Sequence, residues 1–80
     1  GARANFERAL KIDEAIYGMD HPTVAIRLSN QGSVLRDLGD LAGARANYER
    51  ALKIFKNALG DDHPSTRTVQ RNLDSLNEKR

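Results

Sequence analysis

The sequence predicts an all-α fold, a right-handed superhelical stack of antiparallel helix hairpins with four helices in a single domain of 80 residues. Three observations predict it. A segment at 1–12 returns at 43–54, and the two copies differ only where Phe6 becomes Tyr48. Apolar residues recur at three-, four- and seven-residue spacings, as on one face of a helix. No segment alternates apolar and polar residues in the way a strand does.

The repeat has a period of 42 residues. The same offset relates two glycines, two Asp-His-Pro junctions, two asparagines and two serines: Gly18 and Gly60, residues 20–22 and 62–64, Asn30 and Asn72, and Ser33 and Ser75. Repeats of this length stack, because one unit alone cannot bury its apolar face. We therefore expect similar units in a stack that begins and ends inside a unit.

The 42-residue offset also predicts the structure of the two outer segments of the chain. Residues 1–18 are predicted to be the second helix of an incomplete repeat, because they copy the segment that ends at Gly60, where a helix C-terminus favours a left-handed residue. Residues 64–80 are predicted to be the first helix of a next repeat or a capping helix. The final helix keeps only a narrow apolar stripe: Val69, Leu73 and Leu76.

Residues 22–60 are predicted to form one complete helix-turn-helix repeat. Its first helix begins at Pro22, because proline is favoured at the first helical position, and it ends at the Gly39-Asp40 turn. The apolar positions of this helix are Val24, Leu28, Leu35 and Leu38. The stripe of the second helix is Ala44, Tyr48, Ala51 and Phe55. Small residues let the two helices approach closely, while the aromatic residue fills the space between hairpins.

Six residues carry a resemblance to a known family: Leu28, Gly32, Leu35, Ala44, Tyr48 and Ala51. At these spacings the chain resembles tetratricopeptide repeats. The 42-residue period, the Gly60-Asp61-Asp62-His63-Pro64 junction and Asn30 resemble the longer kinesin-light-chain type. The resemblance implies a scaffold that recognises proteins or peptides and is not an enzyme. It also implies that the matching Asn side chains bind the backbone or carboxylate of a peptide.

Two departures from the family pattern affect this interpretation. Gln31 stands where the family prefers Leu. The last helix has Gln70, Asp74 and Asn77 in the places of Leu28, Gly32 and Leu35. One apolar edge and one polar face are what a terminal capping helix needs.

Composition and motifs argue against several other functions. The chain has no Cys, carries a net charge of +2 and contains no run of about 18 apolar residues. We therefore expect a cytoplasmic protein with no cofactor, no metal site, no nucleic-acid partner and no membrane contact. His21 and His63 lie one repeat apart, with no further ligand cluster beside them. Instead, we expect Asp20 and Asp62 to cap the helices that follow them.

The remaining candidate site is the concave groove, which the first helices of successive repeats should line. Asn30 and Asn72, which are identical at the 42-residue offset, are predicted to stand one above the other and face it. An amide suits peptide binding, because it donates and accepts hydrogen bonds at once. Helical geometry extends this surface to further residues. The predicted peptide-binding residues are Asn30, Ser33, Arg36, Asp37, Arg71, Asn72, Ser75 and Lys79. Alternatively, the two amides tie one helix to the next.

Two functions follow, and the sequence leaves both open. The first is a protein-protein interaction module that binds a peptide or partner protein in the groove. The alternative is a purely structural, self-associating segment of a longer solenoid. For the alternative we expect a homo-oligomer formed through the N-terminal helix, because no first helix covers the apolar stripe of residues 1–18.

Overall fold

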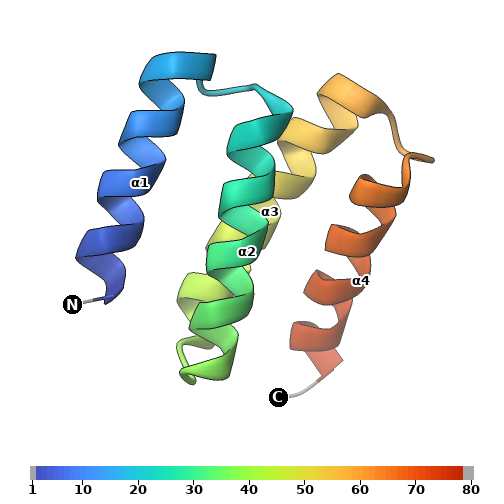
Figure 1. Ribbon diagram of the computed structural model, residues 1–80. Helices are drawn as coiled ribbons and strands as arrows, with labels where there is room; N and C mark the ends of the chain where they lie inside the picture. The colour runs from blue at the N-terminus through green and yellow to red at the C-terminus, as the bar shows by residue number, and fades with distance from the viewer. Residues whose placement is uncertain (1, 79–80) are drawn as a thin grey trace.

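The computed structural model describes residues 2–78 and confirms the all-α prediction (Figure 1). The described residues form four helices and no strand. In chain order these are α1 (Ala2–Tyr17), α2 (Pro22–Asp37), α3 (Leu41–Leu59) and α4 (Pro64–Glu78). Each helix runs antiparallel to the one before it, so α2 and α4 point in the same direction (Figure 1).

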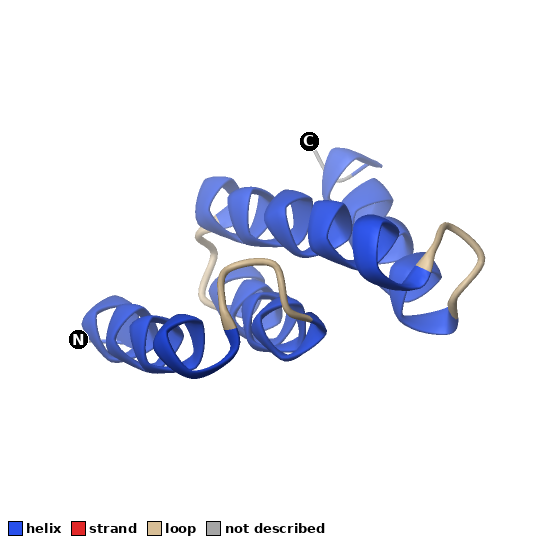
Figure 2. Cartoon of the chain, turned by 90° about the horizontal axis from the view of Figure 1, so that it is seen from above, coloured by secondary structure: helices blue, strands red, loops and turns tan. Residues whose placement is uncertain are grey.

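The hairpin of α2 and α3 is the centre of the molecule. In Figure 1, α2 lies in front of α3, while α1 and α4 flank the hairpin on opposite sides. The view from above shows α2 and α3 side by side, with α1 and α4 at opposite ends of the molecule (Figure 2). The Cα atoms span 35 × 35 × 13 Å, a thin slab. A thin slab of helices exposes much of its surface, so the core is small.

The core lies between α2, α3 and α4. Tyr48 is fully buried and its ring lies against Gly32, where an added Cβ would be 3.0 Å from Cε1 of the ring. The close approach of α2 and α3 therefore depends on the glycine, as the spacing predicted. The buried apolar residues are Val24, Ala25, Leu28, Leu35, Ala44, Tyr48, Ala51, Leu52, Ile54, Phe55, Val69, Leu73 and Leu76.

Leu38 is an exception to the predicted stripe of α2. Its side chain is 65% exposed, so the prediction that it continues the apolar face is wrong. The residue ends the helix: its N–H donates to the Val34 carbonyl, and Gly39 follows with φ of 90°. The chain turns at this glycine, which leaves the leucine at the surface.

The helix starts differ from prediction in the residue that caps them. Nδ1 of His21 accepts a hydrogen bond from the N–H of Thr23 (3.0 Å), and Nδ1 of His63 accepts one from the N–H of Ser65 (3.1 Å). The prediction that Asp20 and Asp62 fill this role is therefore wrong. The aspartates stand one residue too early, because the proline that follows each histidine occupies the first helical position.

We expect His21→Ala to destabilise the protein by about 1 kcal/mol, because the first turn of α2 loses its side-chain acceptor. Asp20→Ala is the matched control and should leave the free energy of unfolding within about 0.5 kcal/mol of the parent, as for most surface substitutions. Urea unfolding followed by circular dichroism measures both. Equal losses in the two variants would contradict the assignment of the cap to histidine.

In the part of the chain that the structure describes, no helix is long and apolar enough to cross a membrane. The ion pairs described between α1 and the hairpin are Asp13 with Arg27 and Glu14 with Arg50. Charges therefore join one helix to another across the stack.

Candidate functional site

A groove of about 240 Å³ lies between α2 and α4, the two parallel first helices. Phe55 of α3 also lines it, between the two walls. The wall residues are Ile26, Ser29 and Asn30 of α2, and Pro64, Ser65, Thr68 and Val69 of α4. The groove thus combines an aromatic and aliphatic surface with hydroxyl and amide groups.

Asn30 is the polar centre of the α2 wall. Its side chain is exposed and makes no hydrogen bond within the described part of the chain. Ile26 and Val34, one helical turn away on either side, are 51% and 43% exposed. An amide with free donor and acceptor groups therefore lies between two exposed aliphatic side chains.

Sequence reasoning missed Ile26 and Val34, although their spacing contained a signal. The two residues stand four positions before and four positions after Asn30, so they share its face. That face lies away from the core stripe of Val24, Leu28 and Leu35. Two β-branched aliphatic residues on a face that also carries a polar amide are a second stripe that the core does not use.

Asn72 and Ser75 lie on the α4 side of the stack. Both are half-buried, and their spacing from Ser65 and Thr68 places them on the same side of α4, beyond the residues that line the groove. The Asn72 side chain makes no hydrogen bond to another described residue. Within the described chain, neither amide ties two helices together.

Ser33 holds the two helices of the central hairpin together. Its Oγ lies 2.7 Å from the hydroxyl of Tyr48 and donates to the carbonyl of Ser29 at 3.3 Å. Arg36 and Asp37 lie farther along α2, and their side chains form an ion pair at 3.4 Å. These three residues are thus engaged with groups of the chain itself.

Arg71 lies apart from the groove. It lines a separate hollow formed by α4, the end of α3 and the loop between them. Its neighbours there are charged or polar: Lys56, Asp61, Thr66, Arg67, Gln70 and Asp74. Lys79 lies outside the described residues. Of the predicted site residues that the structure describes, Asn30 lines the groove. Asn72 and Ser75 lie farther along α4, on the side that faces the groove.

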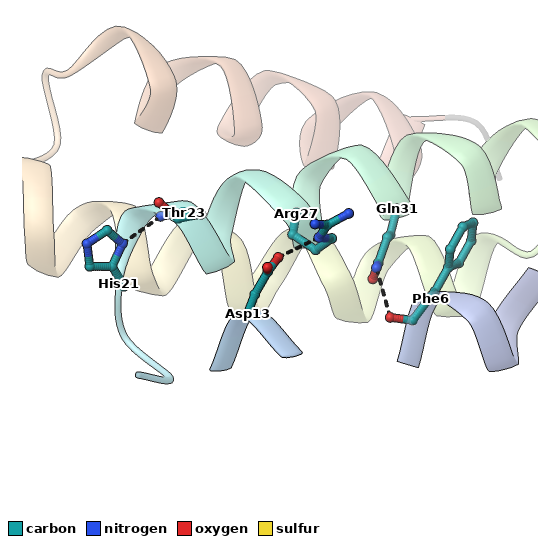
Figure 3. A network of polar contacts seen from close by, with 6 residues as sticks. All are labelled: Phe6, Asp13, His21, Thr23, Arg27 and Gln31. Carbon is teal, nitrogen blue, oxygen red and sulfur yellow. Dashed lines mark hydrogen bonds and ion pairs between the residues drawn. The ribbon is translucent and has the colours of Figure 1, made fainter. Parts of the chain in front are cut away.

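A polar junction joins α1 to α2. Asp13 accepts a hydrogen bond from Nε of Arg27 at 2.5 Å, and Nε2 of Gln31 donates to the Phe6 carbonyl at 3.0 Å (Figure 3). The Asp13 carboxylate raises the pKa of the Arg27 guanidinium above its ordinary value, chiefly through this hydrogen bond, while burial acts in the opposite direction. Because the raised pKa favours the charged form in the folded state, the pair contributes to stability at neutral pH.

The corresponding junction between α3 and α4 is apolar. At the 42-residue offset, Asp13, Arg27 and Gln31 are replaced by three residues of the buried core: Phe55, Val69 and Leu73. The unusual Gln31 is therefore one of three polar substitutions that occur together in one junction. The Gln31 amide donates to the carbonyl of Phe6. This hydrogen bond explains how Gln31 can be buried, with only 6% of its surface exposed.

The described residues contain no group of three or more His, Asp or Glu side chains placed to hold a metal ion.

The fold and its surface define a helical repeat scaffold with a groove between first helices. The sequence model of the tetratricopeptide repeat family matches residues 23–73, and the chain belongs to this family. Repeats of this family generally mediate protein-protein interactions as non-catalytic scaffolds. No curated protein matches the chain.

Proposed function

We propose that the chain binds an extended peptide segment of a partner protein in the groove between α2 and α4. The observation that carries the proposal is the exposed, unpartnered amide of Asn30 on the groove wall. A side-chain amide pairs with both the N–H and the C=O of an extended backbone, whatever the side chains of the peptide. Within the family, we propose the kinesin-light-chain-like type, on the 42-residue period and the Asp-His-Pro junctions.

The apolar groups around this amide supply contact area. Ile26 and Phe55 line the same groove, and Val34 continues the surface along α2. Burial of aliphatic surface contributes about 25 cal/mol per Å², so these side chains add affinity for a peptide with apolar residues. The hydroxyls of Ser65 and Thr68 on the opposite wall offer further hydrogen bonds.

The experiment selects peptides from a random library on the immobilised chain and measures their affinities by fluorescence anisotropy. We expect Asn30→Ala to weaken binding of the selected peptides by about 1 to 2 kcal/mol, or roughly five- to thirtyfold, because one or two hydrogen bonds are lost. The melting temperature should stay unchanged, since the amide has no partner within the described chain.

Asn57→Ala is the matched control, because Asn57 is an exposed asparagine on α3 that does not line the groove. It should leave peptide affinity unchanged. Asn72→Ala should have a smaller effect than Asn30→Ala, since Asn72 lies beyond the lining residues. An unchanged affinity in Asn30→Ala together with a lowered melting temperature would contradict the proposal and give the amide a structural role.

A further inference from the structure

The stack contains two junctions of the same kind, in each of which a second helix meets the first helix that follows it. They are the contact of α1 with α2 and the contact of α3 with α4. The linkers of the two junctions are alike, because Gly18 and Gly60 both have φ of 90° and each linker ends in Asp-His-Pro. A difference in stiffness between the junctions must therefore come from the contacts between the helices.

Polar contacts hold α1 to the rest of the chain. They are the ion pairs of Asp13 with Arg27 and of Glu14 with Arg50, and the hydrogen bond from the Gln31 amide to the Phe6 carbonyl. In both ion pairs the acid is on α1 and the arginine is on α2 or α3. The arginine side chains are 44% and 36% exposed, so water reaches both guanidinium groups. These charged groups can therefore return to water when the junction loosens.

The α3–α4 junction is held in a different way. The residues equivalent to Asp13, Arg27 and Gln31 are all apolar and buried: Phe55, Val69 and Leu73. In addition, Oγ1 of Thr66 donates to the carbonyl of Gly60 at 2.8 Å, which ties α4 to its own linker. The equivalent residue of α2 is Val24, whose side chain has no hydroxyl. The helix α4 also packs on α3 more extensively than α2 packs on α1.

The two kinds of contact respond differently to a small separation of the helices. The attraction between two charges falls with the inverse of their distance, so it keeps about two-thirds of its strength when the distance grows from about 4 Å to about 6 Å. An apolar contact loses roughly a quarter to a half of its dispersion attraction when a gap of about 0.5 to 1 Å opens. The long arginine side chains can also follow a displaced carboxylate, whereas interlocked apolar side chains cannot adjust in this way. The α1–α2 junction is therefore the softer of the two.

We propose that the α1–α2 junction is a charge-held hinge, at which α1 swings relative to a rigid unit of α2, α3 and α4. The fixed end of the hinge is the linker, where the rings of Tyr17 and His21 lie 4.9 Å apart. Arg27 and Gln31 hold α1 at increasing distances from this end (Figure 3). The hinge sets the angle between one repeat and the next, and salt loosens it. The groove between α2 and α4 lies inside the rigid unit, so the hinge does not rest on peptide binding.

Distances between pairs of spin labels measure the hinge. The chain has no Cys, so two introduced cysteines are its only labelling sites. One pair, Lys11→Cys with Ile26→Cys, spans the α1–α2 junction. The other pair, Lys53→Cys with Thr68→Cys, occupies the equivalent exposed positions across the α3–α4 junction. By pulsed electron paramagnetic resonance, we expect the distance distribution of the α1–α2 pair to be about twice as broad as that of the α3–α4 pair.

Salt should act on one junction only. Raising the NaCl concentration from about 0.1 M to about 1 M shortens the Debye length from about 10 Å to about 3 Å. The distribution of the α1–α2 pair should become broader, because its ion pairs are partly exposed and are screened. The distribution of the α3–α4 pair should stay the same.

Transfer of the apolar junction tests the cause of the softness. The triple substitution Asp13→Phe, Arg27→Val and Gln31→Leu gives the α1–α2 junction the side chains of the α3–α4 junction. The two label pairs should then have equal widths, and the response of the α1–α2 pair to salt should be lost. Asp13→Asn, which removes the charge and keeps the shape, should broaden the α1–α2 distribution. Asp37→Asn is its matched control, because it removes an exposed ion pair elsewhere on α2.

Three results would overturn the proposal: equal widths of the two label pairs in the parent chain, an α1–α2 pair that stays broad in the triple variant, or equal broadening by Asp13→Asn and Asp37→Asn. If the triple variant lost its helical circular dichroism, the comparison of Asp13→Asn with Asp37→Asn would decide. None of these measurements involves a peptide, so a failure of the hinge is distinct from a failure of the proposed function.

Discussion

Tyr48→Ala should destabilise the protein by about 3 to 5 kcal/mol, the usual cost of removing a large aromatic side chain from a core. The ring is fully buried against Gly32, and α2 and α3 have no other aromatic residue at their crossing that could fill the space. Small domains have a total stability of only about 5 to 15 kcal/mol, so much of the stability would be lost. Thermal and urea unfolding followed by circular dichroism measure the change.

Tyr48→Phe is the matched control for this prediction. It keeps the ring and removes only the hydroxyl that lies 2.7 Å from Oγ of Ser33. The expected loss is about 1 kcal/mol, the net value of one hydrogen bond. A Tyr48→Ala protein that melts cooperatively within a few degrees of the parent would show that this ring does not hold the hairpin together.

Gly32→Leu should destabilise the protein by about 3 kcal/mol, at the upper end of the range for an overpacked core. A Cβ at this position would lie 3.0 Å from Cε1 and 3.1 Å from Cδ1 of Tyr48, and leucine adds three more carbons beyond it. Either the ring leaves its position or the two helices separate. Urea unfolding measures the loss of stability, and the near-ultraviolet circular dichroism of the tyrosine reports the disturbed ring.

Gly32→Ala separates crowding from backbone effects. It adds only the Cβ, and alanine stabilises a helix interior by roughly 0.5 to 1 kcal/mol relative to glycine. The two effects oppose each other, so the net change should be smaller than about 1 kcal/mol. If Gly32→Leu were as stable as Gly32→Ala, the close approach of the helices at this glycine would be disproved.

The sequence was sufficient to predict the helices and the crossing of the hairpin. Pro22 and the Gly39-Asp40 turn bound α2 in the structure to within a few residues of the prediction, because both act through local backbone conformation. Burial of Tyr48 followed from its periodic spacing. Leu38 was predicted wrongly because periodicity does not show where a helix ends, and the turn takes this residue away from the core.

The candidate site was harder to predict than the fold. Spacing placed Asn30 on a side of α2 that lines a hollow, but it gave no sign that Ser33 would contact Tyr48 or that Arg71 would line another hollow. The contact of Ser33 depends on how α2 packs on α3, and the position of Arg71 depends on how α4 is rotated against α3. The packing of buried residues determines both. The sequence also did not predict that His21 and His63 cap α2 and α4, because residue preferences at helix starts favour aspartate.

The polar junction between α1 and α2 has a consequence for folding. A chain whose segments 1–12 and 43–54 are nearly identical has an alternative pairing, in which α4 folds onto α1 in place of α2. That arrangement would bring Val69 to Asp13 and leave the carboxylate without Arg27.

Burying an unpaired charge costs several kcal/mol, so the incorrect pairing is strongly disfavoured. Neighbouring units that are too similar exchange partners during folding and trap misassembled chains. The Asp13–Arg27 ion pair at the α1–α2 junction and the buried Phe55 at the α3–α4 junction therefore make the two junctions different. This difference favours the packing of α2 on α1 and of α4 on α3.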